Sequence, residues 1–380
     1  AAQAPPGPGG AGLPAPWGAL LAGGQLNAAL LLSTVFSEKY RGRSMVAGDV
    51  AEVRLPGANN GVLHRPSTLL VRAGHREGTV LVWRGPGDGD VVDPTLYVAF
   101  GPLRTNRQFL KVINRTKLKE DVVPVKGGVD GRVETVFVSK YVKHLLDKLW
   151  NKYDFGTQLT ALVREHPHHR LLFAGISHGA ALAQAAALRF ALAEPDAPQR
   201  PHAVTWNGYR WTDAAGSKLA GASVDMLPLV LSREEGGVRR WDSVPEFPAD
   251  YAAMLGVMFL DADTGEFLPE GGEWRLGGTA VTVAAALRMK ELHFARTAMR
   301  AMQLAMAMVQ RSDIYRASSE KCLEWLQDLK LLEFEDVSDG EPAEGDAETV
   351  EDHSDEHGAE SSEEEADAHD QEACVETRGD

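Results

Sequence analysis

Apolar and polar positions follow strand-like runs in the first part of the chain. Residues 67–72 and 79–84 are β-rich and are separated by a turn-like stretch at 73–78, which predicts a β-hairpin. Residues 96–100 and 133–138 predict two further strands. The first half of the chain is therefore expected to build part of a sheet.

Apolar residues recur at helical spacing in three other segments of the chain. Residues 17–36 are mostly apolar, but three glycines and two amides favour a packed helix over residues 26–38 rather than a membrane span. A second pattern predicts one long helix over residues 139–165, and a third predicts a helix over residues 283–309. The last carries a stripe of methionines, which is typical of core packing.

The centre of the chain combines both patterns around a serine. Residues 171–176 predict an apolar strand, which a Gly-x-Ser-x-Gly turn joins directly to an Ala-rich helix beginning at Ala180. Strands are also expected at residues 203–206 and 227–231. Because strand and helix alternate here, we expect an α/β fold with a mostly parallel sheet covered by helices on both faces.

Ser177 lies at the middle of this turn, between Gly175 and Gly179. A tight strand-to-helix turn of this kind lifts a serine hydroxyl out of the sheet, and the glycines leave room for the neighbouring backbone. The helix start below the serine favours negative charge that develops on a substrate oxygen. The alternative is a chance match, which the flanking strand and helix disfavour.

Charge is distributed unevenly and suggests three regions. Residues 333–380 hold 21 Asp and Glu against one Arg, so the other residues carry 33 acidic and 38 basic side chains and are nearly neutral. We expect a disordered Ala/Pro/Gly-rich N-terminus over residues 1–24, a folded α/β domain over 25–332, and a disordered acidic tail over 333–380. Only two cysteines, Cys322 and Cys374, are present, which favours a reducing compartment such as the cytoplasm.

A serine nucleophile needs a histidine base and an acid that orients it. In α/β-hydrolases these follow in the order Ser, Asp or Glu, His. His293 is the one base that this order leaves outside the acidic tail, although a plain helix histidine is the alternative. Asp242 is the favoured acid, because it follows a strand and a hairpin-like turn and precedes Pro245. The other acids of this region are expected to be surface or turn residues: Asp213, Asp225 and Asp250.

Several motifs, taken in order, resemble the fungal-type (class 3) lipases of the α/β-hydrolase fold. They are residues 82–86 for an FRGT-like motif, 175–179 for the elbow, 205–210 for a TFGSPRVGD-like run, 242–245 for a DxVP motif, and His293 for the late histidine. The resemblance covers about residues 25–312. It implies a lipase with the triad Ser177, Asp242 and His293.

Three positions depart from the family pattern. The resemblance places an oxyanion donor at Pro86, which has no backbone N–H, so the N–H groups of His178 and Gly87 are the expected donors. The family usually has leucine where this chain has His178, whose side chain could line the acyl pocket, form a hydrogen bond near Ser177, or face solvent. A lid is expected at residues 87–92, which carry little apolar surface.

The leading hypothesis is an enzyme that cleaves carboxylic esters of lipids, acylglycerols or glycerolipids, with transient contact to a membrane or lipid-droplet surface. The alternative is a catalytically silent lipase-like binding domain with an impaired oxyanion hole. No cofactor, metal or nucleic-acid partner is expected. A metal site at His166, His168 and His169 is disfavoured because no fourth ligand is evident.

Overall fold

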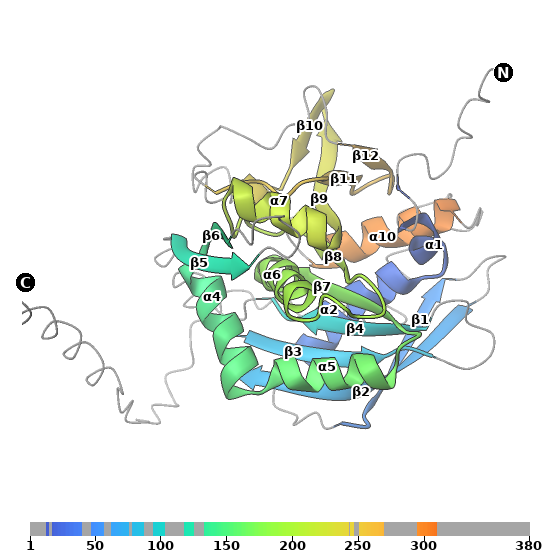
Figure 1. Ribbon diagram of the computed structural model, residues 1–380. Helices are drawn as coiled ribbons and strands as arrows, with labels where there is room; N and C mark the ends of the chain where they lie inside the picture. Colours follow the sequence, from blue (N-terminus) through green and yellow to red (C-terminus); the bar gives the residue numbers. More distant parts are fainter. Residues whose placement is uncertain are drawn as a thin grey trace, which may run out of the picture. The chain divides into compact units, whose positions relative to one another are not determined.

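The computed structural model describes residues 13–14, 17–39, 47–56, 62–75, 78–86, 94–102, 118–124, 133–242, 244–246, 251–269 and 295–309. The chain divides into two units, Ala1–Glu333 and Phe334–Asp380, and every described residue belongs to the first. Its elements in chain order (Figure 1) are α1 (Trp17–Ala22), α2 (Gln25–Lys39), β1 (Val50–Pro56), β2 (Val62–His75), β3 (Gly78–Arg84), β4 (Thr95–Phe100), β5 (Leu118–Pro124), β6 (Val133–Ser139), α4 (Lys140–Asp147), the π-helix η2 (Lys148–Lys152), α5 (Phe155–Glu165), β7 (Arg170–Ile176), α6 (His178–Ala193), β8 (His202–Trp206), α7 (Ala214–Ser223), β9 (Asp225–Glu235), β10 (Val238–Trp241), the 3-10 helix η3 (Val244–Glu246), β11 (Met258–Asp261), β12 (Phe267–Pro269) and α10 (Ala295–Val309).

One large sheet organises the first unit. Its strands follow the order β1-β2-β3-β4-β7-β8-β9-β11-β12, and β10 pairs with β9 beside this path. The central strands β4, β7, β8, β9 and β11 are parallel, whereas β1 to β4 pair antiparallel, as do β9–β10 and β11–β12. The predicted α/β-hydrolase type of fold is confirmed, with a mixed sheet whose parallel part is limited to the centre.

Helices cover both faces of the sheet because its central strands are apolar on both sides. In β7, Leu172 and Ala174 belong to one buried cluster, and Leu171 and Phe173 belong to the other. Helices α1, α2 and α10 contribute to the first cluster, and α4 to α7 contribute to the second. This two-sided burial is the reason why β7 appears in the sequence as a continuous apolar run.

The predicted hairpin and the first predicted helix are confirmed. Strands β2 and β3 pair antiparallel, with Thr79 opposite Gly74, and β2 is longer than expected. Helix α2 is packed in the core, where Leu30 and Leu32 are fully buried. None of the described helices is long and apolar enough to cross a membrane.

The strand predicted at residues 133–138 exists as β6 but lies outside the main sheet. It pairs with β5 in a separate two-stranded sheet. Its end is tied to the loop after β8, since the Ser139 N–H donates to the Trp211 carbonyl at 2.7 Å. A short β-rich run predicts a strand but not its partner, because pairing depends on distant residues.

The single long helix predicted over residues 139–165 is wrong. The chain forms α4, the π-helix η2 and then α5, and Asp154 adopts a left-handed backbone (φ 51°) between them. The Trp150 ring lies where a side chain at Gly156 would be, with Cδ1 2.5 Å from an added Cβ, and it packs on Phe155. The break therefore lets Trp150 fold back onto the start of α5.

The N-terminal boundary differs from the prediction at residue 24. Trp17, Leu20 and Leu21 in α1 are buried, and the Trp17 ring meets His202 edge-on at 5.6 Å. These three apolar side chains bury enough surface to join the core, so the packed part of the chain includes α1. At the other end, α10 accounts for residues 295–309 of the predicted late helix, and residues 283–294 lie outside the described residues.

Candidate active site

Ser177 occupies the turn between β7 and α6 with a backbone (φ 55°, ψ −120°) that few non-glycine residues adopt. A Cβ added at Gly175 would lie 2.2 Å from the Gly179 carbonyl oxygen, and one at Gly179 would lie 2.4 Å from the Phe100 carbonyl oxygen. Both glycines are thus required by close backbone contacts. The strained serine between them is the predicted nucleophile elbow.

Ser177 lies where the central parallel strands end, which we call the carboxyl edge of the sheet; the opposite side is the amino edge. The Ser177 N–H donates to the Trp206 carbonyl at 2.9 Å, so the serine lies beside the last residue of β8. Ligands and catalytic groups of parallel α/β sheets gather at this edge. The elbow is therefore placed where chemistry is expected.

Asp242 lies at the same edge, and backbone hydrogen bonds connect its position to that of Ser177. The residue after β8, Asn207, donates its N–H to Leu229 and accepts the Leu231 N–H on Oδ1, both at 2.8 Å. The Leu231 carbonyl in turn accepts the Asp242 N–H at 2.9 Å. Asp242 thus lies beside the end of β8, and Ser177 lies on the opposite side of the same strand end.

The Asp242 carboxylate is buried, with 1% exposure, and is oriented by its own loop. Its Oδ1 accepts the Val244 N–H at 2.9 Å, and the chain then turns through η3 at Pro245. This geometry agrees with the prediction that the proline turns the chain after the acid.

Arg210 holds this acid loop and was not singled out by sequence reasoning. Its buried guanidinium donates from Nε to the Pro245 carbonyl and from Nη1 to the Tyr251 carbonyl, both at 3.1 Å. The sequence does contain a signal for this residue, because Arg210 ends the TFGSPRVGD-like run over residues 205–210. Charge-assisted bonds of this kind stiffen an otherwise irregular segment.

The side chain of His178 does not face solvent. It is 1% exposed, its Nδ1 lies 3.1 Å from the Tyr209 hydroxyl, and its ring stacks on Tyr209 and tilts against Tyr141. Burial, followed by the nearby Tyr141 and Tyr251 hydroxyls, raises the pKa of Tyr209 well above its usual value, so the phenol stays neutral. The backbone N–H of His178 lies at the first position of α6, directly after Ser177, which is the position of an oxyanion donor in α/β-hydrolases.

The placement of the oxyanion site at Pro86 is wrong. Strand β3 runs antiparallel to β4, with Val80 opposite Phe100 and Arg84 opposite Leu96, and β4 runs parallel to β7. The end of β3 is therefore at the amino edge, and Pro86 lies roughly 20 Å along the strand from the level of the elbow. The second predicted donor, Gly87, and the predicted lid over residues 87–92 lie outside the described residues.

A second Gly-Pro pair, which sequence reasoning missed, lies at the elbow instead. Strand β4 ends at Phe100, and the carbonyl oxygens of Phe100 and Gly101 lie 2.4 and 2.9 Å from a Cβ added at Gly179. In α/β-hydrolases the second oxyanion donor comes from the loop after the strand beside the elbow strand, which here is β4. The Gly101 N–H already donates to Thr79 at 3.4 Å, and Pro102 has no N–H.

His293 lies outside the described residues, and α10 begins two residues after it at Ala295. Within the described part of the chain, no group of three or more His, Cys, Asp or Glu could hold a metal ion. This part includes the loop of His166, His168 and His169, where the rings of the first and last meet at 4.8 Å.

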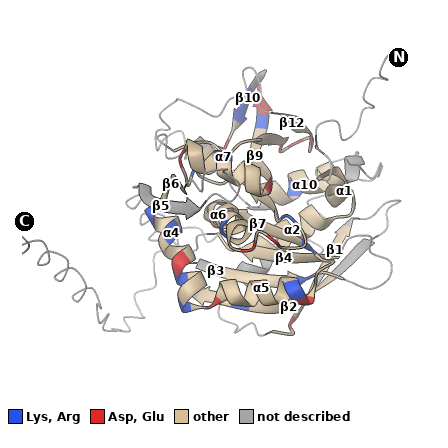
Figure 2. Ribbon diagram, viewed as in Figure 1, with Lys and Arg blue, Asp and Glu red and all other residues tan. Residues whose placement is uncertain are grey.

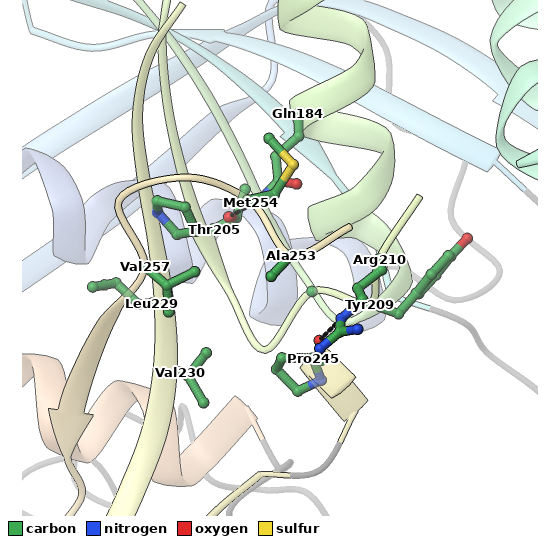
Figure 3. A pocket seen from close by; sticks show the side chains of 12 residues that line it. Gln184, Thr205, Tyr209, Arg210, Leu229, Val230, Pro245, Ala253, Met254 and Val257 are labelled. Atoms are coloured by element: carbon green, nitrogen blue, oxygen red, sulfur yellow. Dashed lines mark hydrogen bonds between the residues drawn. The ribbon is translucent and has the colours of Figure 1, made fainter. Parts of the chain in front are cut away.

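A cavity lies behind the acid loop, between α6, the β8–β9 strands and residues 251–257 (Figure 3). It has room for about one water molecule. Gln184 bridges its wall, donating to Thr205 Oγ1 at 2.7 Å and accepting from Trp211 Nε1 at 2.8 Å. A cavity of this size cannot hold an acyl chain, so it belongs to the packing of the loop.

A strained serine elbow at the carboxyl edge, with a buried acid beside the next strand, defines an α/β-hydrolase. Residues 97–251 match the family model described as "Lipase (class 3)". This match begins in β4 and includes the elbow and Asp242. Residues 97–251 thus match the family that the motifs resemble, and the predicted enzyme class, a carboxylic ester hydrolase, is confirmed.

Solved structures of fungal lipases are similar to this chain. A triacylglycerol lipase from Penicillium expansum shares 18% identity over 66% of this chain and 84% of that one, with a TM-score of 0.45. MDLA from Penicillium cyclopium shares 14% identity over 74% and 96%, with a TM-score of 0.49. The triacylglyceride lipase of Rhizomucor miehei shares 15% identity over 52% and 66%, with a TM-score of 0.37. A comparison with curated proteins gives no match.

Proposed function

We propose that this protein hydrolyses carboxylic esters of lipids, with acylglycerols or membrane glycerolipids as the substrate class. The observation that carries the proposal is the joint placement of Ser177 and Asp242, one on each side of the end of β8. A histidine between them would complete the relay from serine to acid.

His293 is the proposed base. It follows Ser177 and Asp242 in the order that α/β-hydrolases use. Helix α10, which begins two residues later, pairs through Arg300 with Asp263 in the turn after β11. That turn is at the carboxyl edge, and this supports a base delivered to the same edge.

In the proposed reaction, Ser177 Oγ attacks the ester carbonyl while His293 accepts its proton. Asp242 holds the imidazole in the required tautomer and balances its charge. The negative oxygen of the tetrahedral intermediate is stabilised by the His178 N–H and by a second donor from the chain beyond Pro102. His293 then gives the proton to the leaving alcohol, and water releases the fatty acid in a second cycle of the same steps.

The substrate class comes from the family and from the similar fungal enzymes, two of which are named for triacylglycerol or triacylglyceride. A water-insoluble ester requires that the carboxyl edge contacts a membrane or lipid-droplet surface for a short time. Binding at that surface is a step separate from the chemistry on the ester.

One observation favours a second function, lipid binding by a catalytically silent domain. The Gly101–Pro102 pair beside the elbow provides no N–H for the oxyanion, since the Gly101 N–H is bonded to Thr79 and Pro102 has none. If no later residue supplied the second donor, the reaction would be slower by roughly two to three orders of magnitude.

A fluorophosphonate probe separates the two functions. An active enzyme should be labelled and should hydrolyse a short-chain soluble ester, and both activities should disappear in Ser177→Ala. Ser223→Ala, at the end of α7, is the control that should keep them. A folded parent protein that neither reacts with the probe nor cleaves the ester would support the silent domain.

The base and the acid are tested by His293→Ala and Asp242→Asn. Each should lower kcat by about 10³- to 10⁴-fold and leave the thermal unfolding temperature close to that of the parent. Full activity in either variant would remove that residue from the triad.

A further inference from the structure

The turn after β11, residues 261–265, is a rigid structure at the carboxyl edge. Asp261 Oδ1 accepts the N–H groups of Asp263 and Thr264 at 3.0 and 2.8 Å, and the Asp261 N–H donates to the Glu266 carbonyl at 2.9 Å. The Ala262 N–H is bonded to the Ser232 carbonyl of β9 at 2.8 Å. The turn is therefore fixed both internally and to the central sheet.

The strand that leads to the acid is anchored on this turn. Arg239 on β10, three residues before Asp242, donates through Nη1 to Asp261 Oδ2. The pair is largely buried, with side-chain exposures of 13% and 5%. Because a buried ion pair loses much of its value when either partner moves, it fixes β10 at a defined distance from the turn.

The helix that follows the proposed base is anchored on the same turn. Arg300 on α10 pairs with Asp263 at 3.8 Å, and the other carboxylate oxygen of Asp263 accepts from Arg233 Nε of β9 at 2.8 Å. One helical turn further along, a Cβ added at Gly265 would lie only 2.5 Å from Ala305 N. An ion pair and a close backbone contact thus fix the position of α10 along its axis and its rotation about that axis.

We propose that the turn at residues 261–265 is a shared anchor that sets the position of the acid relative to the base, with Arg239 and Arg300 as positioning residues. The inference rests on the proposed function, in which Asp242 orients His293. These two residues come from segments far apart in the sequence, and Asp242 follows β10 rather than a central strand. Their hydrogen bond needs placement to within about 0.5 Å, which a common rigid support provides.

Figure 2 shows basic and acidic residues side by side on the β9–β10 hairpin, and this offers a matched control. Arg240, next to Arg239, pairs with Glu235 on the hairpin itself at 3.6 Å, and both side chains are about half exposed. Arg240→Met removes the same charge from the same strand but keeps the ion pairs of Arg239, Arg233 and Arg300 with the turn.

The experiment measures kcat and KM for a soluble ester in Arg239→Met, Arg300→Met and Arg240→Met. We expect kcat to fall about 10- to 100-fold in the first two variants, with KM nearly unchanged, because the substrate still binds while the proton relay is displaced. Arg240→Met should keep the kcat of the parent. Arg300→Lys should recover most of the loss, since it restores the charge that faces Asp263.

A purely structural role would lower the thermal unfolding temperature of the Arg239 and Arg300 variants while the folded fraction kept the kcat of the parent, and that result would overturn the inference. If Arg239→Met does not fold, Asp263→Asn gives the second test, because it removes the α10 pair and leaves the Arg239–Asp261 pair in place. Failure of the proposed function is distinguishable: the parent itself would then neither hydrolyse the ester nor react with the fluorophosphonate.

Discussion

Two Gly-Pro pairs, each directly after a strand of the same sheet, lie at opposite edges. Gly85–Pro86 follows β3 at the amino edge, and Gly101–Pro102 follows β4 at the carboxyl edge, in contact with the elbow. Both stretches share a Val-x-x-Gly-Pro pattern, from Val82 to Pro86 and from Val98 to Pro102. Strand direction decides which of them can take part in chemistry, and direction is a property of the whole sheet.

The edges also differ in how tightly the backbone is packed. At the carboxyl edge a Cβ on Gly179 would lie 2.4 Å from the Phe100 carbonyl oxygen, whereas at the amino edge one on Gly85 would lie 3.0 Å from the Tyr97 ring. A ring can move by a few tenths of an ångström, but the backbone under the elbow cannot. Gly179 at the carboxyl edge therefore tolerates an added side chain less well than Gly85 does, although the Thr95 carbonyl also lies 3.3 Å from a Cβ at Gly85.

Substitution of one glycine at each edge is expected to give the largest difference between the two edges. Gly179→Ala should destabilise the protein by about 2–3 kcal/mol and remove nearly all hydrolysis, because β4 and α6 must separate. Gly85→Ala should cost less than about 1 kcal/mol and keep the activity. Urea unfolding and ester hydrolysis measure both, and equal losses in the two variants would contradict the difference between the edges.

Much of the fold could be predicted from the sequence, because its signals are local. The apolar run before Ser177, the β2–β3 turn and the apolar helix α2 each follow from a short stretch. The break of the predicted long helix was missed, since it depends on Trp150 folding back over Gly156.

The site was partly predictable for the same reason. Ser177 and Asp242 stand in compact motifs, and both lie at the carboxyl edge, although their catalytic roles stay a prediction. The oxyanion loop was misplaced, because two similar Gly-Pro stretches can be distinguished only by strand direction. The anchoring ion pairs of Arg239 and Arg300 join segments that no local pattern connects.

The second prediction compares the two prolines. Pro102→Ala should lower kcat about 5- to 10-fold, because the fixed φ of proline orders the start of the loop that is proposed to carry the second oxyanion donor. Pro86→Ala, at the other edge, should leave kcat within about two-fold of the parent. A fall in kcat confined to Pro86→Ala would show instead that the oxyanion loop follows β3.

A smaller effect is expected from the phenol that supports the elbow. Tyr209→Phe removes the hydroxyl next to His178 Nδ1 and should cost about 1 kcal/mol of stability and a few-fold in kcat, since the first residue of α6 is held less firmly. Urea unfolding and steady-state kinetics on a soluble ester give the two values. An unchanged kcat would show that stacking alone holds His178 in place.

The smallest effect is expected at the amino edge, where His202 begins β8 and is buried beside Trp17. Burial, and then the nearby Arg170, lower its pKa below the ordinary 6.5, against the opposing effect of Asp225. As pH falls below about 6.5, the unfolded chain therefore binds a proton before the folded one does, and stability is lost. Between about pH 7.5 and about pH 5.5, the unfolding temperature of His202→Gln should therefore fall less than that of the parent. Its hydrolysis of a soluble ester at neutral pH should match that of the parent, because the amino edge carries no part of the proposed relay. A fall in kcat with unchanged stability would show instead that the two edges are coupled through β8.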